Sequence, residues 1–200
     1  MTSDLAQQLA AARERVAAAA RSAGRDPAEV QLLLAVKAQP VEAVREAVAQ
    51  GARLLGHNRA QELTATAPGL ADLDHEMHFI GHLQSNKATK VVPLVSCVQS
   101  VDRLSIAQRL DRLAGEAGRV LEVFVQVNTS EETTKAGAAP GEALELAAEV
   151  GALANLRLRG LMTIGANSPD AGVVREFYEQ LARLRDEVAA SGAPGTGGAV

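Results

Sequence analysis

Several residue types are scarce in this chain of 200 residues, and each scarcity excludes a class of protein. Cys97 is the single cysteine, so no disulfide can form within the chain. Tryptophan is missing and aromatic residues make up 2%, which disfavours a base-stacking platform for nucleic acids. No apolar run approaches the ~18 residues of a membrane span, and the N-terminus lacks the apolar core of a signal peptide. The net charge of −4 favours neither a nucleic-acid nor a membrane partner, so we expect a cytoplasmic protein.

The sequence does contain a regular alternation of short apolar runs and amphipathic stretches. Apolar residues at three- and four-residue spacing from Leu5 to Ala19 predict a first helix, capped by Ser3 or Asp4. Residues 30–36 form a nearly continuous apolar run, typical of a parallel strand that is buried on both faces. Five more strands are predicted at 53–56, 77–81, 94–100, 120–128 and 156–164. Helices are predicted at 40–51, 58–66, 83–91, 101–114, 141–151 and 169–190.

This order of elements predicts an α/β protein with a parallel sheet, in a single domain over residues 1–200. Two architectures remain open. A doubly wound open sheet can stop after six strands, whereas a TIM-type (β/α)8 barrel has two more strands and typically needs ~250 residues. In both architectures ligands bind at the carboxyl ends of the strands. The residues that follow each predicted strand are therefore the candidates for chemistry.

Lys37 follows the first predicted strand directly and is one of four lysines. Apolar walls around an amine penalise its charged form, and the neutral amine is the nucleophile that attacks an aldehyde. One interpretation is therefore a lysine that forms a Schiff base, and the other is a lysine that reaches from a strand end to water. The other three lysines, Lys87, Lys90 and Lys135, lie in polar stretches and are expected to be solvated.

Three histidines lie close enough in the sequence to be candidate metal ligands. His75, His78 and His82 are close in sequence, but only His78 and His82 would share a strand face. No carboxylate or cysteine completes a set at standard spacing, so we expect no metal. No G-x-G-x-x-G motif follows the first strand, which disfavours a dinucleotide-binding domain.

Several segments, spanning roughly residues 30 to 165 in strand order, form a recognisable set. The most specific is the run from His78 to Lys87, His-Phe-Ile-Gly-His-Leu-Gln-Ser-Asn-Lys. The others are Leu33-Leu-Ala-Val-Lys37, Gly56-His-Asn58 with Gln61-Glu62, Ser100-Val-Asp-Arg103, Val125-Gln-Val-Asn128 with Lys135-Ala-Gly137, and Leu158-Arg-Gly-Leu-Met162. Together these segments resemble the pyridoxal phosphate homeostasis proteins, relatives of the alanine racemase barrel domain.

The resemblance implies a TIM-type (β/α)8 barrel of the alanine racemase N-terminal type. It also implies pyridoxal 5′-phosphate (PLP) held as a Schiff base on Lys37, with Asn58, His82 and Met162 at matching positions near the cofactor. Members of the family are regarded as PLP carriers or regulators without an established reaction. This implies a monomer that passes PLP to apoenzymes. The alternatives are a PLP-dependent racemase or decarboxylase of the same fold, and a cofactor-free Schiff-base aldolase.

Two departures from the family pattern bear on the site. His57 stands where the family usually has glutamate. The chain also lacks the Ser-x-Gly-Met-Ser and Arg-x-Gly-x-x-x-Phe-Gly segments, which form the last two strands of the family barrel and cradle the phosphate. We therefore expect a barrel truncated after its sixth βα unit, with the aldehyde anchor present and the phosphate anchor absent.

Overall fold

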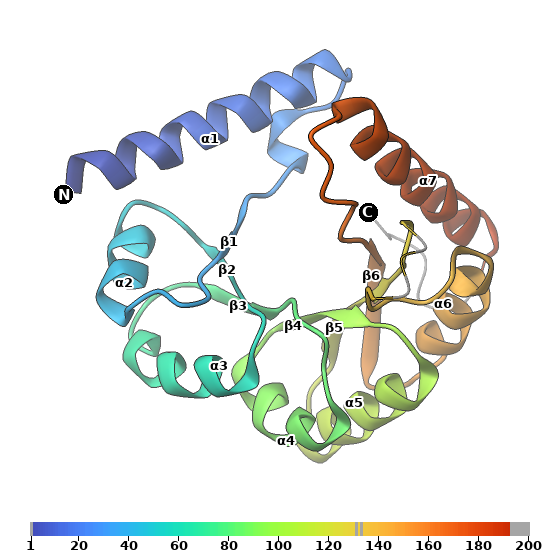
Figure 1. The fold of residues 1–200 in the computed structure, drawn as a ribbon. Coiled ribbons are helices and arrows are strands. Elements are labelled where there is room, and N and C mark those ends of the chain that lie inside the picture. The colour runs from blue at the N-terminus through green and yellow to red at the C-terminus, as the bar shows by residue number, and fades with distance from the viewer. Residues whose placement is uncertain (1, 131, 133, 193–200) are drawn as a thin grey trace. The chain divides into compact units, whose positions relative to one another are not determined.

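The computed structural model describes residues 2–130, 132 and 134–192 (Figure 1). Contacts group the chain into two compact units, Met1–His78 and Phe79–Val200, and each is described by itself. The single domain over residues 1–200 stays a prediction. No helix in the described part of the chain is long and apolar enough to cross a membrane.

The first unit contains a helix, two βα steps and then strand β3. Strands β1 and β2 are parallel, with Leu33 opposite Leu54 and Ala35 opposite Gly56. Strand β3 follows β2 in the sheet. The elements are α1 (Thr2–Ser22), η1 (Pro27–Glu29), β1 (Leu33–Ala35), α2 (Val41–Ala49), β2 (Leu54–His57), α3 (Ala60–Thr66), η2 (Ala67–Leu70) and β3 (Glu76–Phe79).

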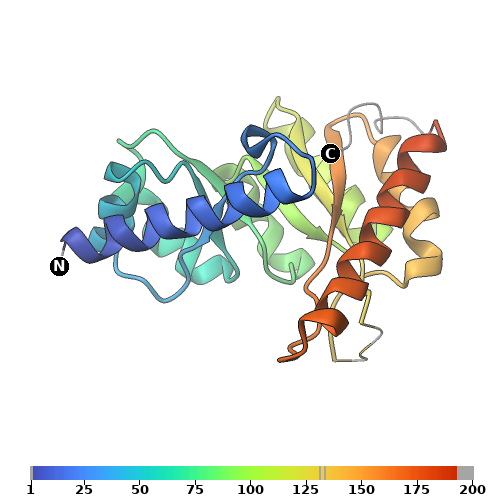
Figure 2. The ribbon, with the colours of Figure 1, turned by 90° about the horizontal axis from the view of Figure 1, so that it is seen from above.

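The second unit is built around the parallel strands β4, β5 and β6, which lie side by side in chain order. Helices α4 to α7 lie on one side of these strands, and α6 lies beside α7 (Figures 1 and 2). The elements are η3 (Ser85–Lys87), α4 (Ala88–Val91), η4 (Val92–Leu94), β4 (Cys97–Val101), α5 (Leu104–Glu116), β5 (Leu121–Gln126), η5 (Pro140–Glu142), α6 (Ala143–Gly151), β6 (Leu156–Met162) and α7 (Ala171–Ala190).

Alternation along β5 separates a fully buried face from a half-buried face. On β5, Leu121, Val123 and Val125 are fully buried, whereas Glu122 and Phe124 between them are half-buried. The core of this unit forms where those apolar side chains meet the buried positions of the covering helices. These are Ile106, Ala107, Leu110 and Ala114 on α5, and Ala143, Leu146, Ala147 and Val150 on α6.

All six predicted strands are present in the predicted order, but several helix boundaries differ from the predictions. Helix α1 begins at Thr2, ahead of the expected caps Ser3 and Asp4. The stretch 83–91 is two short helical turns rather than one helix. Helix α7 begins after Asp170, whose carboxylate accepts a hydrogen bond from the Gly172 amide, and not at the predicted residue 169. A short polar side chain does not identify the first residue of a helix when several such side chains lie within three residues of one another.

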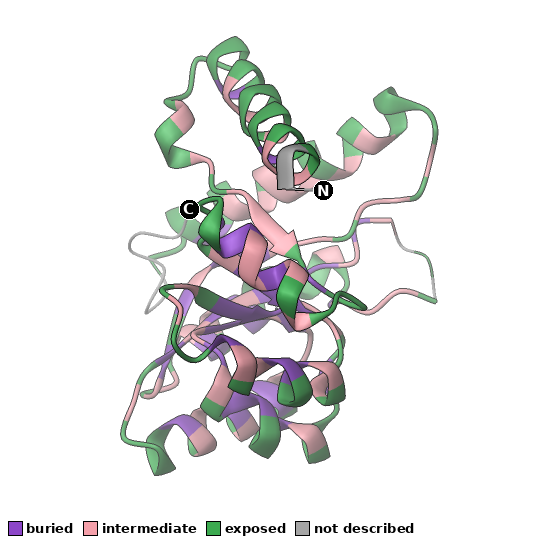
Figure 3. Ribbon diagram, turned by 90° about the vertical axis from the view of Figure 1, so that its left-hand side faces the viewer, coloured by how far each residue is buried: buried purple, intermediate pink, exposed green. Residues whose placement is uncertain are grey.

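The prediction that the first strand is buried on both faces is wrong. Strand β1 covers only three residues, and its side chains are half-buried or exposed. Its paired neighbour in the sheet is β2. On the other side α1 packs loosely: Leu9 and Ala20 are its buried residues, and most of the helix that starts at N is exposed or intermediate (Figure 3). The apolar run is therefore a strand that its neighbours cover in part.

Candidate functional site

Lys37 and Asn58 follow the carboxyl ends of the neighbouring strands β1 and β2. Ala35 pairs with Gly56, and the Val36 amide donates to the Gly56 carbonyl at 3.0 Å. Lys37 lies in a turn two residues after Ala35, and Asn58 directly follows β2. The register therefore brings the two strand ends together, and it stays a prediction that the Lys37 and Asn58 side chains meet the same ligand.

Lys37 is exposed, and in the described part of the chain its amine has no hydrogen-bond partner. Of the two interpretations of Lys37, its exposure matches a lysine that reaches from a strand end to water, because the β1 side chains that would enclose it are themselves only partly covered. The backbone next to Lys37, in contrast, is held in a defined conformation.

Ala38, which follows Lys37, has a φ of 58°, a left-handed conformation that an alanine rarely adopts. Its amide donates to Oε2 of Glu62 on α3 at 3.1 Å. Oε1 of the same carboxylate lies 3.4 Å from the Arg59 guanidinium. The hydrogen bond to a charged acceptor offsets the local strain. It also ties the turn that carries Lys37 to the start of α3, which explains Glu62 within the recognised Gln61-Glu62 segment.

Asn58 presents an unsatisfied polar atom at the carboxyl end of β2. Its Oδ1 is buried and has no hydrogen-bond partner within the described structure. A buried amide oxygen without a partner is costly, since desolvation is not compensated. A polar ligand bound beside Lys37 would supply the missing partner.

His57 is the last residue of β2 and is buried. It is 1% exposed, and neither ring nitrogen has a hydrogen-bond partner among the described residues. Burial lowers the pKa of His57 below its ordinary value, and the charge of Glu62 opposes this only in part. The residue that stands where the family usually has glutamate is therefore a buried imidazole whose charged form is disfavoured.

Acid should destabilise the protein through His57. The unfolded imidazole takes up a proton near its ordinary pKa of about 6.5, whereas the folded one, with its lowered pKa, does not. The unfolded state then binds more protons, so the free energy of unfolding should fall as pH drops from 7 towards 5, by at most about 1.4 kcal/mol per pH unit for this one proton. Urea denaturation across that range measures the slope.

His57→Phe should flatten this slope between pH 7 and 5. His75→Gln is the control, because it removes a half-buried histidine whose Nδ1 lies 3.0 Å from the Leu73 carbonyl oxygen. An unchanged slope in His57→Phe would show that other groups cause the acid sensitivity.

In the second unit, His82 forms an ion-pair contact with Asp102. His82 follows β3 and Asp102 follows β4, and His82 Nδ1 lies 3.0 Å from Asp102 Oδ2. The other oxygen, Oδ1, accepts from Arg103 Nη1 at 2.5 Å. The Asp102 side chain is only 9% exposed, whereas that of His82 is 50% exposed. The imidazole thus stands at the surface of the unit with a buried carboxylate behind it.

Met162 is the last residue of β6, and it pairs with Gln126 on β5. The two therefore share one face, and the Val127 amide donates to the Met162 carbonyl at 2.8 Å. Ser100 on β4 is 1% exposed, and its hydroxyl has no partner among the described residues. These polar groups lie at the carboxyl ends of β4 to β6. Ser100 ends the predicted strand 94–100 and was therefore among the candidates, whereas sequence reasoning missed Gln126, although it lies in a recognised segment.

The loop after β5 folds back onto the strand from which it leaves. The buried Gln126 side chain donates to the Ala136 carbonyl at 2.8 Å. Backbone bonds join Asn128 to Ala138 and Ala138 to Gln126. Gly137 has a φ of 134° and packs against the Asn128 backbone. The Val125–Asn128 and Lys135–Gly137 segments are therefore two halves of one backbone structure.

Lys135 is not solvated as expected. Its ammonium donates to Glu132 Oε1 at 2.7 Å and to the Gly165 carbonyl at 3.1 Å. The hydrogen bond from Lys135 is the main cause of the lowered pKa of Glu132. These contacts join the loop after β5 to the loop after β6.

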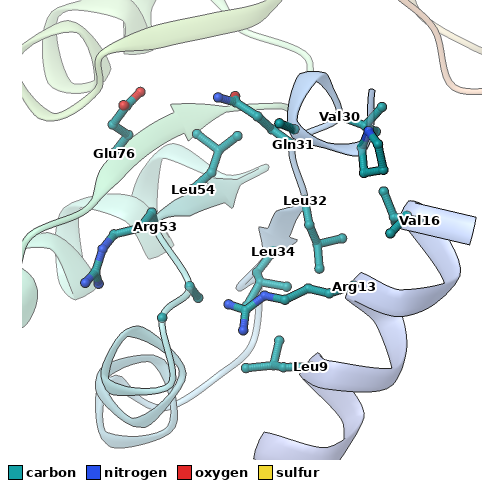
Figure 4. A pocket seen from close by; sticks show the side chains of 15 residues that line it. Leu9, Arg13, Val16, Val30, Gln31, Leu32, Leu34, Arg53, Leu54 and Glu76 are labelled. Carbon is teal, nitrogen blue, oxygen red and sulfur yellow. The ribbon is translucent and has the colours of Figure 1, made fainter. Parts of the chain in front are cut away.

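A cavity of about 480 Å³ in the first unit lies away from these residues. Arg53 precedes β2 and Glu76 begins β3, so the cavity is at the amino ends of the strands (Figure 4). Its apolar wall comes from α1, the β1 region and β2, namely Leu9, Val16, Leu32, Leu34 and Leu54. It therefore reflects the loose packing of α1 on β1 and does not include Lys37 or Asn58. No group of three or more metal-binding side chains occurs in the described chain.

Comparison with known proteins identifies a family. Residues 7–195 match the model of the alanine racemase N-terminal domain. A pyridoxal phosphate homeostasis protein of Pseudomonas aeruginosa is 43% identical over 182 residues, which cover 91% of this chain and 79% of that protein. A counterpart of Escherichia coli K12 is 40% identical over 177 residues, covering 87% and 75%.

Solved structures agree with this assignment. PipY of Synechococcus elongatus PCC7942, with PLP bound, superposes with a TM-score of 0.80 at 34% identity, covering 94% of this chain and 82% of PipY. An alanine racemase of Clostridium difficile has a TM-score of 0.68 at 15% identity, covering 82% of this chain and 42% of the racemase, and shows the fold alone. The expected fold class is confirmed: parallel βα units of an unclosed, TIM-type α/β sheet. The chain belongs to the alanine racemase N-terminal domain family.

Proposed function

We propose that this protein binds PLP as a Schiff base on Lys37 and serves intracellular PLP homeostasis. The observation that carries the proposal is at the paired ends of β1 and β2: the exposed Lys37 amine follows β1, and the Asn58 amide oxygen that follows β2 is buried without a partner among the described residues. An aldehyde cofactor with polar ring substituents fits both groups. The names of the relatives and the PLP in the PipY structure support the same ligand.

Each residue has a defined task in this proposal. The Lys37 amine adds to the aldehyde carbon of PLP, and loss of one water leaves the carbon–nitrogen double bond. Asn58 forms a hydrogen bond with a polar group of the ligand. In the second unit, His82 and Met162 are proposed to contact the cofactor, His82 through hydrogen bonding and Met162 through apolar packing. The protein is proposed to act as a cytoplasmic monomer that passes PLP to apoenzymes.

The test is to mix the purified protein with PLP and record the absorption spectrum before and after borohydride reduction. We expect a visible band that disappears on reduction, and a reduced adduct that peptide mapping places on Lys37. An adduct spread over Lys87, Lys90 and Lys135 would refute the site. A turnover assay with amino acids separates a carrier from a PLP-dependent racemase or decarboxylase, since a carrier consumes no amino acid.

A further inference from the structure

The contact between His82 and Asp102 has a chemical consequence for the imidazole. A carboxylate only accepts hydrogen bonds, so Nδ1, at 3.0 Å from Asp102 Oδ2, must carry a proton. In the neutral ring the second nitrogen, Nε2, then has a free lone pair. Which nitrogen is protonated is thus fixed before any ligand binds.

Asp102 is itself held in place. Its second oxygen accepts from Arg103, the residue just before α5, so both oxygens are engaged and the carboxylate has a neighbouring positive charge. The burial of Asp102 keeps water from competing for these bonds, which makes them stronger than an exposed ion pair. The imidazole of His82 is half-exposed, so its orientation depends on the contact with Asp102.

We propose that Asp102 is a positioning residue that fixes His82 in the Nδ1–H form and presents Nε2 as the hydrogen-bonding atom for the bound cofactor. This rests on the proposed function and deepens it by naming the atom of His82 that meets the ligand. The arrangement follows the general rule that a carboxylate behind a histidine sets its tautomer and orientation. Arg103 holds the carboxylate.

The direct test is nitrogen NMR of the imidazoles in PLP-free protein, with His82→Gln to assign the signal. The wild-type His82 should show the Nδ1–H form, and Asp102→Asn should reverse the ratio of the two tautomers by roughly tenfold or more, since it removes a charged acceptor. Asp186→Asn is the matched control. Asp186 also pairs with the arginine next to it, at 2.6 Å, and among the described residues no histidine forms an ion pair with it.

A second measurement concerns the ligand. Asp102→Asn should weaken PLP binding by roughly tenfold, as expected for one lost hydrogen bond, while Asp186→Asn leaves it unchanged. An Nε2–H form in the wild type, an unreversed ratio in Asp102→Asn, or reversal without weaker binding would each overturn the proposal. The wild-type spectrum decides even if Asp102→Asn does not fold. If the wild type takes up no PLP, the proposed function fails, and the spectrum alone judges the role of Asp102.

Discussion

Replacing Lys37 with alanine is expected to abolish the visible absorption band that the protein gains with PLP. The methyl group cannot form the carbon–nitrogen double bond, so only non-covalent contacts remain. We expect complete loss of the band and of the borohydride-reduced adduct. The far-UV circular dichroism should stay unchanged, because Lys37 is exposed and makes no described hydrogen bond.

Two control variants make this result specific to Lys37. Lys87→Ala and Lys90→Ala each remove an amine from the η3–α4 segment and should keep the full band. A Lys37→Ala protein that still turns yellow, with the adduct on another lysine, would show that the covalent site lies elsewhere in the chain.

Gly137→Ala is expected to cause the largest loss of stability of any variant considered. A Cβ at this position would lie 2.5 Å from the Asn128 backbone nitrogen and 2.8 Å from the Val127 carbonyl carbon. The φ of 134° is also unfavourable for any residue with a side chain. Strain and overpacking of rigid backbone together should cost about 2–5 kcal/mol of the free energy of unfolding. Urea denaturation followed by circular dichroism measures this loss.

Gly141→Ala provides a control within the same connection. A Cβ there would meet nothing within 4 Å, so the free energy of unfolding should change by about 0.5 kcal/mol or less. Equal stabilities for the two variants would mean that the loop after β5 can move away from Asn128 at little cost, and that Gly137 is not required by the fold.

The order of elements could be predicted from the sequence because it depends on patterns of a few residues. Apolar runs separated by amphipathic stretches identify βα units wherever they occur. The run 120–128 is an example. It predicted β5, and its alternate residues Leu121, Val123 and Val125 are core positions in the structure. The position of Lys37 after the first strand followed from the same pattern.

The environment of each candidate could not be predicted, because it depends on pairing between strands. The register of β1 against β2 decides which residues at the end of β2 lie near Lys37. No local sequence pattern predicts this register. The exposure of Lys37 depends on how completely α1 covers β1. The partners of His82 and Gln126 lie 20 and 10 residues away in the chain, so only the folded backbone shows them.

The pairing of β1 with β2 makes the turn before β2 sensitive to insertions. Leu54 and Gly56 pair with Leu33 and Ala35, and His57 at the end of β2 is 1% exposed. A slip of one residue would move each side chain of β2 to the other face, since strand faces alternate with a period of two. One added residue between Gly51 and Leu54 is therefore expected to displace the buried imidazole and to shift Asn58 against the end of β1. The short turn before β2, with Gly51 in a left-handed conformation, thus sets the register on which the relative positions of Lys37 and Asn58 depend.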